Sequence, residues 1–175
     1  MADDAKVASA AAGAAFWRFS LALYARPGVA PALLMLQDRA GRDVNLILYA
    51  LWFGAGCGRP LDRTALGSAE AAVAPLAGVV AELRGLRRRR LPAAPDPLLQ
   101  ALQKRIAALE LAGERGAQEC LATSGAAAPA GVRETNDRLA LAAANLDLYL
   151  GGEAGSPEAA VLRAALAGLM RQSQN

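Results

Sequence analysis

The stretch that decides the fold is VNLILYALWFGA, residues 44–55, because it is apolar on every side of a helix. One face carries Val44, Ile47, Leu48, Leu51 and Ala55, and another carries Leu46, Tyr49 and Phe53. A helix that is apolar nearly all round is buried by its neighbours. Asp43 precedes the stretch as the expected N-cap. We therefore predict a central helix over about 44–56, with the rest of the chain packed around it.

Helices are predicted on both sides of this stretch from apolar residues at helical spacing and from the turn residues between them. The expected ranges are about 13–25, 29–40, 63–90, 97–121 and 132–150, followed by a last helix that starts at Ser156-Pro157. Gly41 is an expected C-cap, and Asp62, Asp96 and Ser156 are expected N-caps. The predicted fold class is therefore all-α, an irregular or orthogonal bundle of six or seven helices.

Two of these helices carry further expectations. Pro75 lies inside the range 63–90, and the apolar steps of three and four residues continue past it, so we predict one kinked helix. The helix over 97–121 is expected to bury one apolar face. That face consists of Leu98, Leu102, Ile106 and Leu109.

The composition supports a single helical domain. The chain has 175 residues and is 54% hydrophobic, and most of that content is alanine and leucine, which favour helices. This length suits one domain with a sizeable core. We expect residues 1–12 to be a flexible, alanine-rich N-terminus and residues 13–172 to form the domain.

The basic charge of the chain is local. The net charge is +3, and the segment from Glu82 to Arg105 alone contains seven cations and two acids. Three of the cations, Arg84, Arg87 and Arg88, fall on one side of a helix. We expect intramolecular salt bridges there, or else contact with a protein or a small anion. Nucleic acid is disfavoured because no aromatic residues are interleaved with these arginines.

The residue types argue against most catalytic chemistry. The chain contains no histidine and two cysteines, so it lacks the commonest general base and zinc ligand. Cys57 lies near Arg59, which could activate its thiol, but we favour a small buried hydrophobe. We name no catalytic residue, metal ligand or cofactor and lean toward a non-enzyme. The uncharged run over 44–58 is too short for a membrane span, and we expect a cytoplasmic protein.

A polar cluster lies where two apolar helices meet. It contains Gln37, Asp38, Asp43 and Asn45, which could converge beside Trp17, Tyr24 or Trp52. These groups could line a small ligand-binding pocket. The interpretation we favour is structural, with Asp43 capping a helix and Asn45 bonded to buried polar groups. Whether the cluster is a site or a set of caps stays open.

Four short motifs lie in the first 90 residues: Phe16-Trp17; Leu33-Leu34-Met35-Leu36-Gln37-Asp38 with Gly41 and Asp43-Val44-Asn45-Leu46; Leu51-Trp52; and Leu83-Arg84-x-x-Arg87-Arg88. These motifs carry a resemblance to a family of short proteobacterial proteins of unknown function. This resemblance covers most of the first 90 residues, and the second half matches only in general helical character. The resemblance implies a bacterial, cytoplasmic protein and supplies no activity, cofactor or substrate.

The function these observations favour is a non-catalytic adaptor, assembly or regulatory protein. It would bind a protein partner through the arginine-rich helix or through the aromatic end of the chain. The alternative is a small-ligand or enzymatic pocket lined by Asp38, Asp43 and Asn45. A weaker alternative is binding to nucleic acid or to an anionic membrane. The oligomeric state stays open, a homo-oligomer included.

Overall fold

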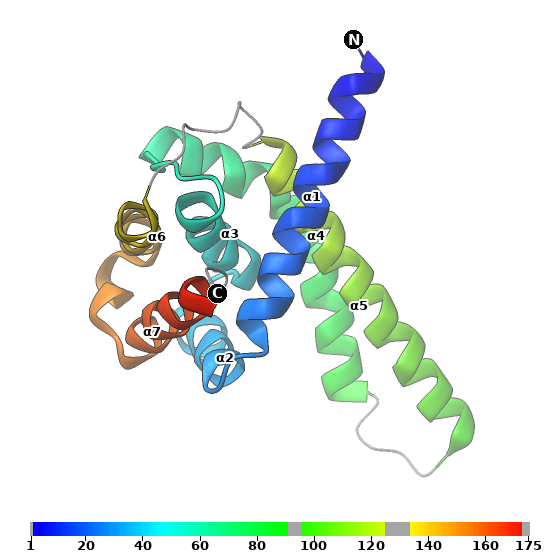
Figure 1. Ribbon diagram of the computed structural model, residues 1–175. Helices are drawn as coiled ribbons and strands as arrows, with labels where there is room; N and C mark the ends of the chain where they lie inside the picture. The colour runs from blue at the N-terminus through cyan, green and yellow to red at the C-terminus, as the bar shows by residue number, and fades with distance from the viewer. Residues whose placement is uncertain (1, 91–95, 125–133, 173–175) are drawn as a thin grey trace.

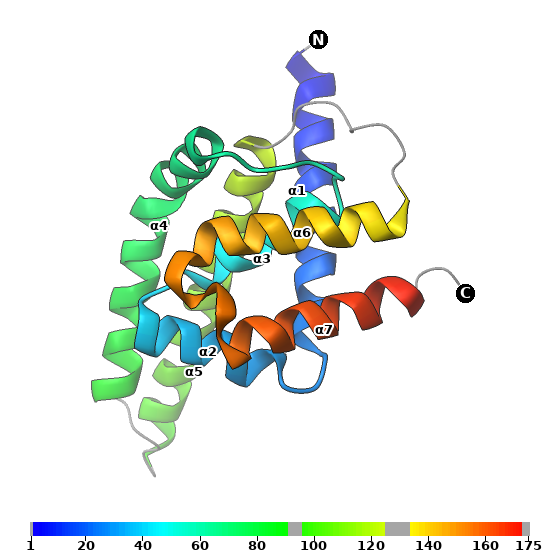
Figure 2. The ribbon, with the colours of Figure 1, turned by 90° about the vertical axis from the view of Figure 1, so that its left-hand side faces the viewer.

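Helix α3 (Val44–Ala55) lies in the middle of the computed structural model, which describes residues 2–90, 96–124 and 134–172 (Figure 1). Helices α6 (Thr135–Leu150) and α7 (Pro157–Gln172) lie on one side of it. Helices α1 (Ala2–Tyr24), α4 (Arg63–Arg90) and α5 (Pro97–Ser124) lie on the other (Figures 1 and 2). Helix α2 (Val29–Ala40) and a 3₁₀-helix, Gly151–Gly155, complete the described elements. No strand occurs among the residues described, and the prediction of an all-α bundle is confirmed.

The core is built on α3, as predicted. Every residue from Asn45 to Ala55 is buried. The ring of Phe16 on α1 stacks on Trp52 with ring centroids 4.9 Å apart, and Tyr49 lies 5.3 Å from Phe53. Such aromatic packing combines a large buried area with preferred ring geometry. The position of α3 therefore follows from its sequence, which offers no face that favours water.

The predicted caps are confirmed. The Asp43 carboxylate accepts hydrogen bonds from the backbone N–H of Asn45 at 2.7 Å and from that of Leu46. The side chains of Asp62, Asp96 and Ser156 accept from the backbone N–H groups of Ala65, Leu98 and Ala159. Gly41 ends α2 at φ 63°, a left-handed conformation that glycine adopts readily. Each cap satisfies helix N–H or C=O groups that otherwise have no partner.

Helix α1 begins earlier than the predicted start near residue 13, and the range 2–12 is helical. Alanine favours helix, and the early part of α1 packs on the C-terminal end of α5. There Ser9 and Thr123 form a hydroxyl–hydroxyl bond of 2.7 Å. This long-range support is invisible in the sequence around residue 10. At its other end α1 meets α2 at an angle of 102°.

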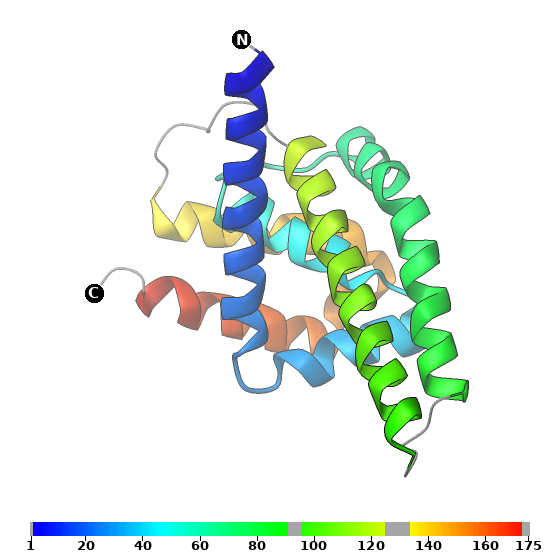
Figure 3. The same cartoon turned by 90° about the vertical axis from the view of Figure 1, so that its right-hand side faces the viewer.

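Helices α4 and α5 form a long antiparallel hairpin that projects beyond the rest of the bundle (Figures 1 and 3). Helix α4 continues through Pro75 as one element, as predicted. The predicted inner face of α5 is wrong, since only its member Ile106 is buried. The other three leucines are exposed: Leu98 at 80%, Leu102 at 46% and Leu109 at 57%. The hairpin extends past the bundle, so no core reaches Leu98 and Leu102 in the first turns of α5. Leu109 is adjacent to the buried Glu110 in sequence but lies on another face of the helix.

Helix α4 is the described helix whose length and composition would allow it to cross a membrane on its own. An 18-residue window of it has a mean hydropathy of 1.4, and 22% of that window is buried. A helix packed inside a soluble bundle has the same length and composition. Here α4 lies against α5 and is joined to it by ion pairs of Arg84 and Arg87. The absence of a transmembrane segment stays a prediction.

Two tyrosines and one cysteine that are shielded from water at or near α3 predict that the protein loses stability at alkaline pH. Burial raises the pKa of Tyr49 and of Tyr149 to about 12, and that of the Cys57 thiol to about 11. The folded state keeps these groups neutral, so their contribution is complete below their unfolded pKa values, 10.0 for tyrosine and 9.0 for cysteine. It is lost as the pH rises through the folded values. We expect the free energy of unfolding to fall steadily between about pH 9 and pH 12.

Urea denaturation at a series of alkaline pH values measures this decline. Tyr49→Phe keeps the ring and removes one ionisable group, so its slope should be shallower by up to about 1.4 kcal/mol per pH unit above pH 10. A Tyr49→Phe profile parallel to that of the parent protein would contradict the prediction.

Candidate functional site

A pocket of about 520 Å³ opens where α1, α2 and α3 meet the α4–α5 hairpin. Its apolar lining comes mainly from Trp17, Leu21, Tyr24, Leu34, Val44, Leu48 and Leu111. Its polar lining consists of Ser20, Gln37, Asn45, Arg84, Arg87, Arg88, Glu110, Glu114 and Gln118. We call this pocket the groove. Its volume lies in the range of about 300–1,000 Å³ that is typical of binding sites.

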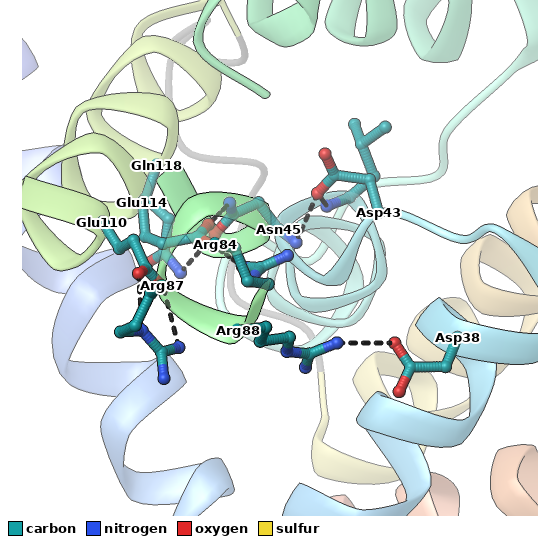
Figure 4. A network of polar contacts seen from close by, with 10 residues as sticks. Asp38, Asp43, Asn45, Arg84, Arg87, Arg88, Glu110, Glu114 and Gln118 are labelled. Atoms are coloured by element: carbon teal, nitrogen blue, oxygen red, sulfur yellow. Dashed lines mark hydrogen bonds and ion pairs between the residues drawn. The ribbon is translucent and has the colours of Figure 1, made fainter. Parts of the chain in front are cut away.

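The floor of the groove is a chain of amide and hydroxyl groups that joins α1, α5 and α3. The Ser20 hydroxyl donates to Gln118 Oε1 at 2.9 Å, and Gln118 Nε2 donates to Asn45 Oδ1 at 3.1 Å. Asn45 Nδ2 donates in turn to the Glu114 carboxylate (Figure 4). Asn45 is 5% exposed, so its amide needs hydrogen-bond partners inside the protein. Gln118 and Glu114 supply them.

One wall of the groove consists of arginines from α4 that bind carboxylates of α5 (Figure 4). Arg84 Nη2 lies 2.5 Å from Glu114 Oε1. Arg87 holds Glu110 through two bonds, from Nε at 2.7 Å and from Nη2 at 3.0 Å. The hydrogen bond to Glu110 raises the pKa of Arg87 above its usual value. Glu110 is 7% exposed, so this bidentate pair is the most enclosed part of the wall.

Arg88 differs from the other two arginines of the wall. Its Nη1 lies 3.7 Å from Asp38 Oδ1 on α2, and both side chains are about half exposed. A long, solvated ion pair of this kind contributes little, about 0–1 kcal/mol. Arg88 therefore presents a charge at the rim that no strong internal contact holds.

The residues predicted for a ligand pocket divide into two groups. Gln37 and Asn45 line the groove, and Asp38 lies at its edge against Arg88. Asp43 instead caps α3 and is not part of the lining, and Trp52 is buried in the core against Phe16. The two aspartates therefore do not converge on one site. The capping interpretation of Asp43 is confirmed.

The arginines predicted as an anion or partner site all reach the groove, but α5 supplies acidic partners that the sequence reasoning missed. Glu110, Glu114 and Gln118 are spaced four residues apart, which places them on one face of a helix. Arg84 and Arg87 follow a similar spacing on α4. Matching an acidic row to a basic row across the hairpin could have found these pairs.

The polar groups that line the groove include amides, guanidiniums, carboxylates, the Ser20 hydroxyl and the Tyr24 phenol. Burial and the nearby Glu114 raise the pKa of Tyr24, so its phenol stays neutral at physiological pH. Cys57 lies outside the groove. Burial raises the pKa of its thiol to about 11, although Arg59 and Arg138 lower it. This raised pKa argues against an activated thiol. Within the described ranges no three cysteine, aspartate or glutamate side chains cluster closely enough to hold a metal ion.

Comparison with known proteins identifies the family of the chain. No curated protein and no solved structure matches it. The model of a family described as proteins of unknown function, DUF2390, matches residues 15–121. This range takes in every residue that lines the groove, from Trp17 to Gln118, and excludes α6 and α7. The match spans more than half of the sequence, and the chain belongs to the DUF2390 family.

Proposed function

We propose that the protein is a non-catalytic binding protein whose groove accepts an acidic, amphipathic segment of another protein. The observation that carries this proposal is the rim of the groove. Large apolar side chains stand exposed there, Leu21 at 53%, Leu34 at 41% and Leu111 at 57%, beside the loosely held Arg88. An apolar concave surface next to a cation suits a helix with apolar anchors and an acidic flank.

The apolar part of the rim supplies the affinity in this proposal. Isolated exposed leucines are common on protein surfaces, but these three come from α1, α2 and α5 and border one pocket. Tyr24, 38% exposed, adds a ring whose hydroxyl can bond to a partner. Burying such side chains contributes about 25 cal/mol per Å² of apolar surface removed from water.

The arginine wall supplies selectivity for acidic partners. Arg84 and Arg87 already bind Glu114 and Glu110, so they shape the wall. Arg88 can exchange Asp38 for a carboxylate of the partner, because the existing contact is long and solvated. Aspartate or glutamate next to the apolar anchors of a partner helix would meet Arg88 at the rim.

We further propose that the protein has no catalytic activity and is located in the cytoplasm of a bacterium. The hydroxyl that lines the groove, on Ser20, is bonded to the amide of Gln118, which cannot act as a general base. Cys57 is a free thiol, which agrees with a reducing compartment.

A helical peptide library displayed on phage tests the proposal. We expect selected peptides to carry leucine or aromatic anchors at helical spacing together with acidic residues. By fluorescence polarisation, Arg88→Glu and Leu34→Ser should each weaken binding of a selected peptide at least about tenfold. Arg105→Glu is the matched control, since it reverses an exposed charge outside the groove and should leave binding unchanged.

Two results would contradict the proposal. One is selection of peptides with no acidic preference, and the other is equal weakening by Arg105→Glu and Arg88→Glu. Thermal unfolding of each variant checks that the groove is intact.

The second candidate function is binding of a small carboxylate or phosphate ligand in the same groove. The observation that favours it is that two amides, of the buried Asn45 and of Gln37, line the same groove together with apolar side chains. A thermal-shift screen with small anionic metabolites separates the two candidates. A ligand that raises the melting temperature and competes with the selected peptide supports the small-ligand function.

A further inference from the structure

The far end of the α4–α5 hairpin carries exposed leucines outside the groove. Leu98, Leu99 and Leu102 lie in the first two turns of α5 and are 80%, 39% and 46% exposed. None of them lines the groove. We call this part of α5, residues 97–105, the tip. It projects beyond the other described helices (Figures 1 and 3).

The end of the hairpin that includes the tip is also the most basic part of the chain. Between Gly85 and Ala107 the sequence contains six cations, five of them arginine, and Asp96 as the one acid. Arg89 on α4 and Lys104 and Arg105 on α5 have exposed side chains. Lys104 and Arg105 therefore follow the three exposed leucines along α5.

We propose that the tip docks the protein on an anionic lipid bilayer. A projecting end with leucines presents a convex apolar surface, which enters a fluid interface without needing a complementary groove. A second copy is disfavoured as the occupant, because contact between two tips would bring like charges together. Acidic lipid headgroups instead complement the arginines and Lys104.

The spacing along α5 fits the interface of a bilayer. Lys104 follows Leu98 by six positions, which is about 9 Å along a helix axis. Apolar side chains of interfacial helices enter about 5–10 Å below the headgroups. With Leu98 and Leu102 in the acyl boundary, Lys104 and Arg105 lie at the level of the phosphates.

Vesicle flotation with the full chain tests the proposal. We expect binding to vesicles of equimolar phosphatidylcholine and phosphatidylglycerol, none to phosphatidylcholine alone, and weakening by salt. The double variant Leu98→Ser/Leu102→Ser should weaken binding at least about tenfold. Leu109→Ser is the matched control: it changes a leucine on the same helix that is 57% exposed but lies farther from the tip.

Charge variants complete the design. Lys104→Glu/Arg105→Glu should abolish binding to the anionic vesicles, whereas Arg63→Glu, at the opposite end of α4, should not change it. Leu34→Ser, in the groove, should also leave it unchanged, so this result is independent of the proposed function. No binding to anionic vesicles, equal binding to neutral ones, or equal loss with Leu109→Ser would overturn the proposal. Circular dichroism verifies that the variants fold.

Discussion

Replacing Gly54 with alanine should lower the free energy of unfolding by about 3 kcal/mol, although alanine is the better helix former. A Cβ atom at position 54 would lie 2.3 Å from the backbone nitrogen of Ala142 and 2.4 Å from its Cα. Backbone atoms of α6 cannot move aside as a flexible side chain can. Helix α3 and α6 must therefore separate, which opens the core along their whole contact.

The matched control is Gly78→Ala in α4. Gly78 is also inside a helix, and a Cβ there would meet nothing within 4 Å. This variant should be more stable than the parent by about 0.5–1 kcal/mol. Urea denaturation measures both effects, and Gly54→Ala should lower the melting temperature by roughly 6–12 °C. A Gly54→Ala protein as stable as Gly78→Ala would show that α3 and α6 do not cross this closely.

Gly54 also shows which features of the fold can be predicted from the sequence and which cannot. The apolar periodicity predicts the helix over 44–56 and its burial, because a helix without a polar face has one stable environment. Gly54 itself, with Gly56 and Gly58, is typical of a connection between helices. Its actual role depends on Ala142, which is far away in the sequence. The local pattern predicts elements and caps, whereas contacts between distant helices depend on the assembled bundle.

Helix α5 shows the same limit for the candidate site. Leucines at helical spacing predict an inward face at Leu98, Leu102 and Leu109. The first two lie where the hairpin extends past the core, and Leu109 lies on another face of the helix from Glu110. Among the side chains that α5 does bury is an acid, Glu110, which is 7% exposed and is neutralised by Arg87 on α4. A buried acid opposite an arginine requires knowledge of which helices pair. The sequence does predict Asn45 as a site candidate, because an amide among apolar residues needs partners, and the arginines, because they lie on one side of a helix.

Replacing Arg87 with methionine should destabilise the fold by about 2 kcal/mol, which is less than the 3–5 kcal/mol typical of fully buried ion pairs. Glu110 would remain enclosed without the two bonds that hold it at 2.7 and 3.0 Å. The Arg87 side chain is 32% exposed, and water reaching the site reduces the penalty. Arg88→Met is the control: it breaks only the 3.7 Å contact with Asp38 and should change stability by less than about 0.5 kcal/mol.

The double variant Arg87→Met/Glu110→Met separates loss of the pair from loss of packing. Removing both charges leaves no buried carboxylate without a partner, so we expect stability within about 1 kcal/mol of the parent protein. Restored stability would assign Arg87 to the scaffold of the groove and leave Arg88 as the arginine that can receive an acidic partner. If Arg87→Met is instead as harmless as Arg88→Met, Glu110 is solvated without its partner. The whole arginine row is then a water-exposed face, and the division of roles between Arg87 and Arg88 is wrong.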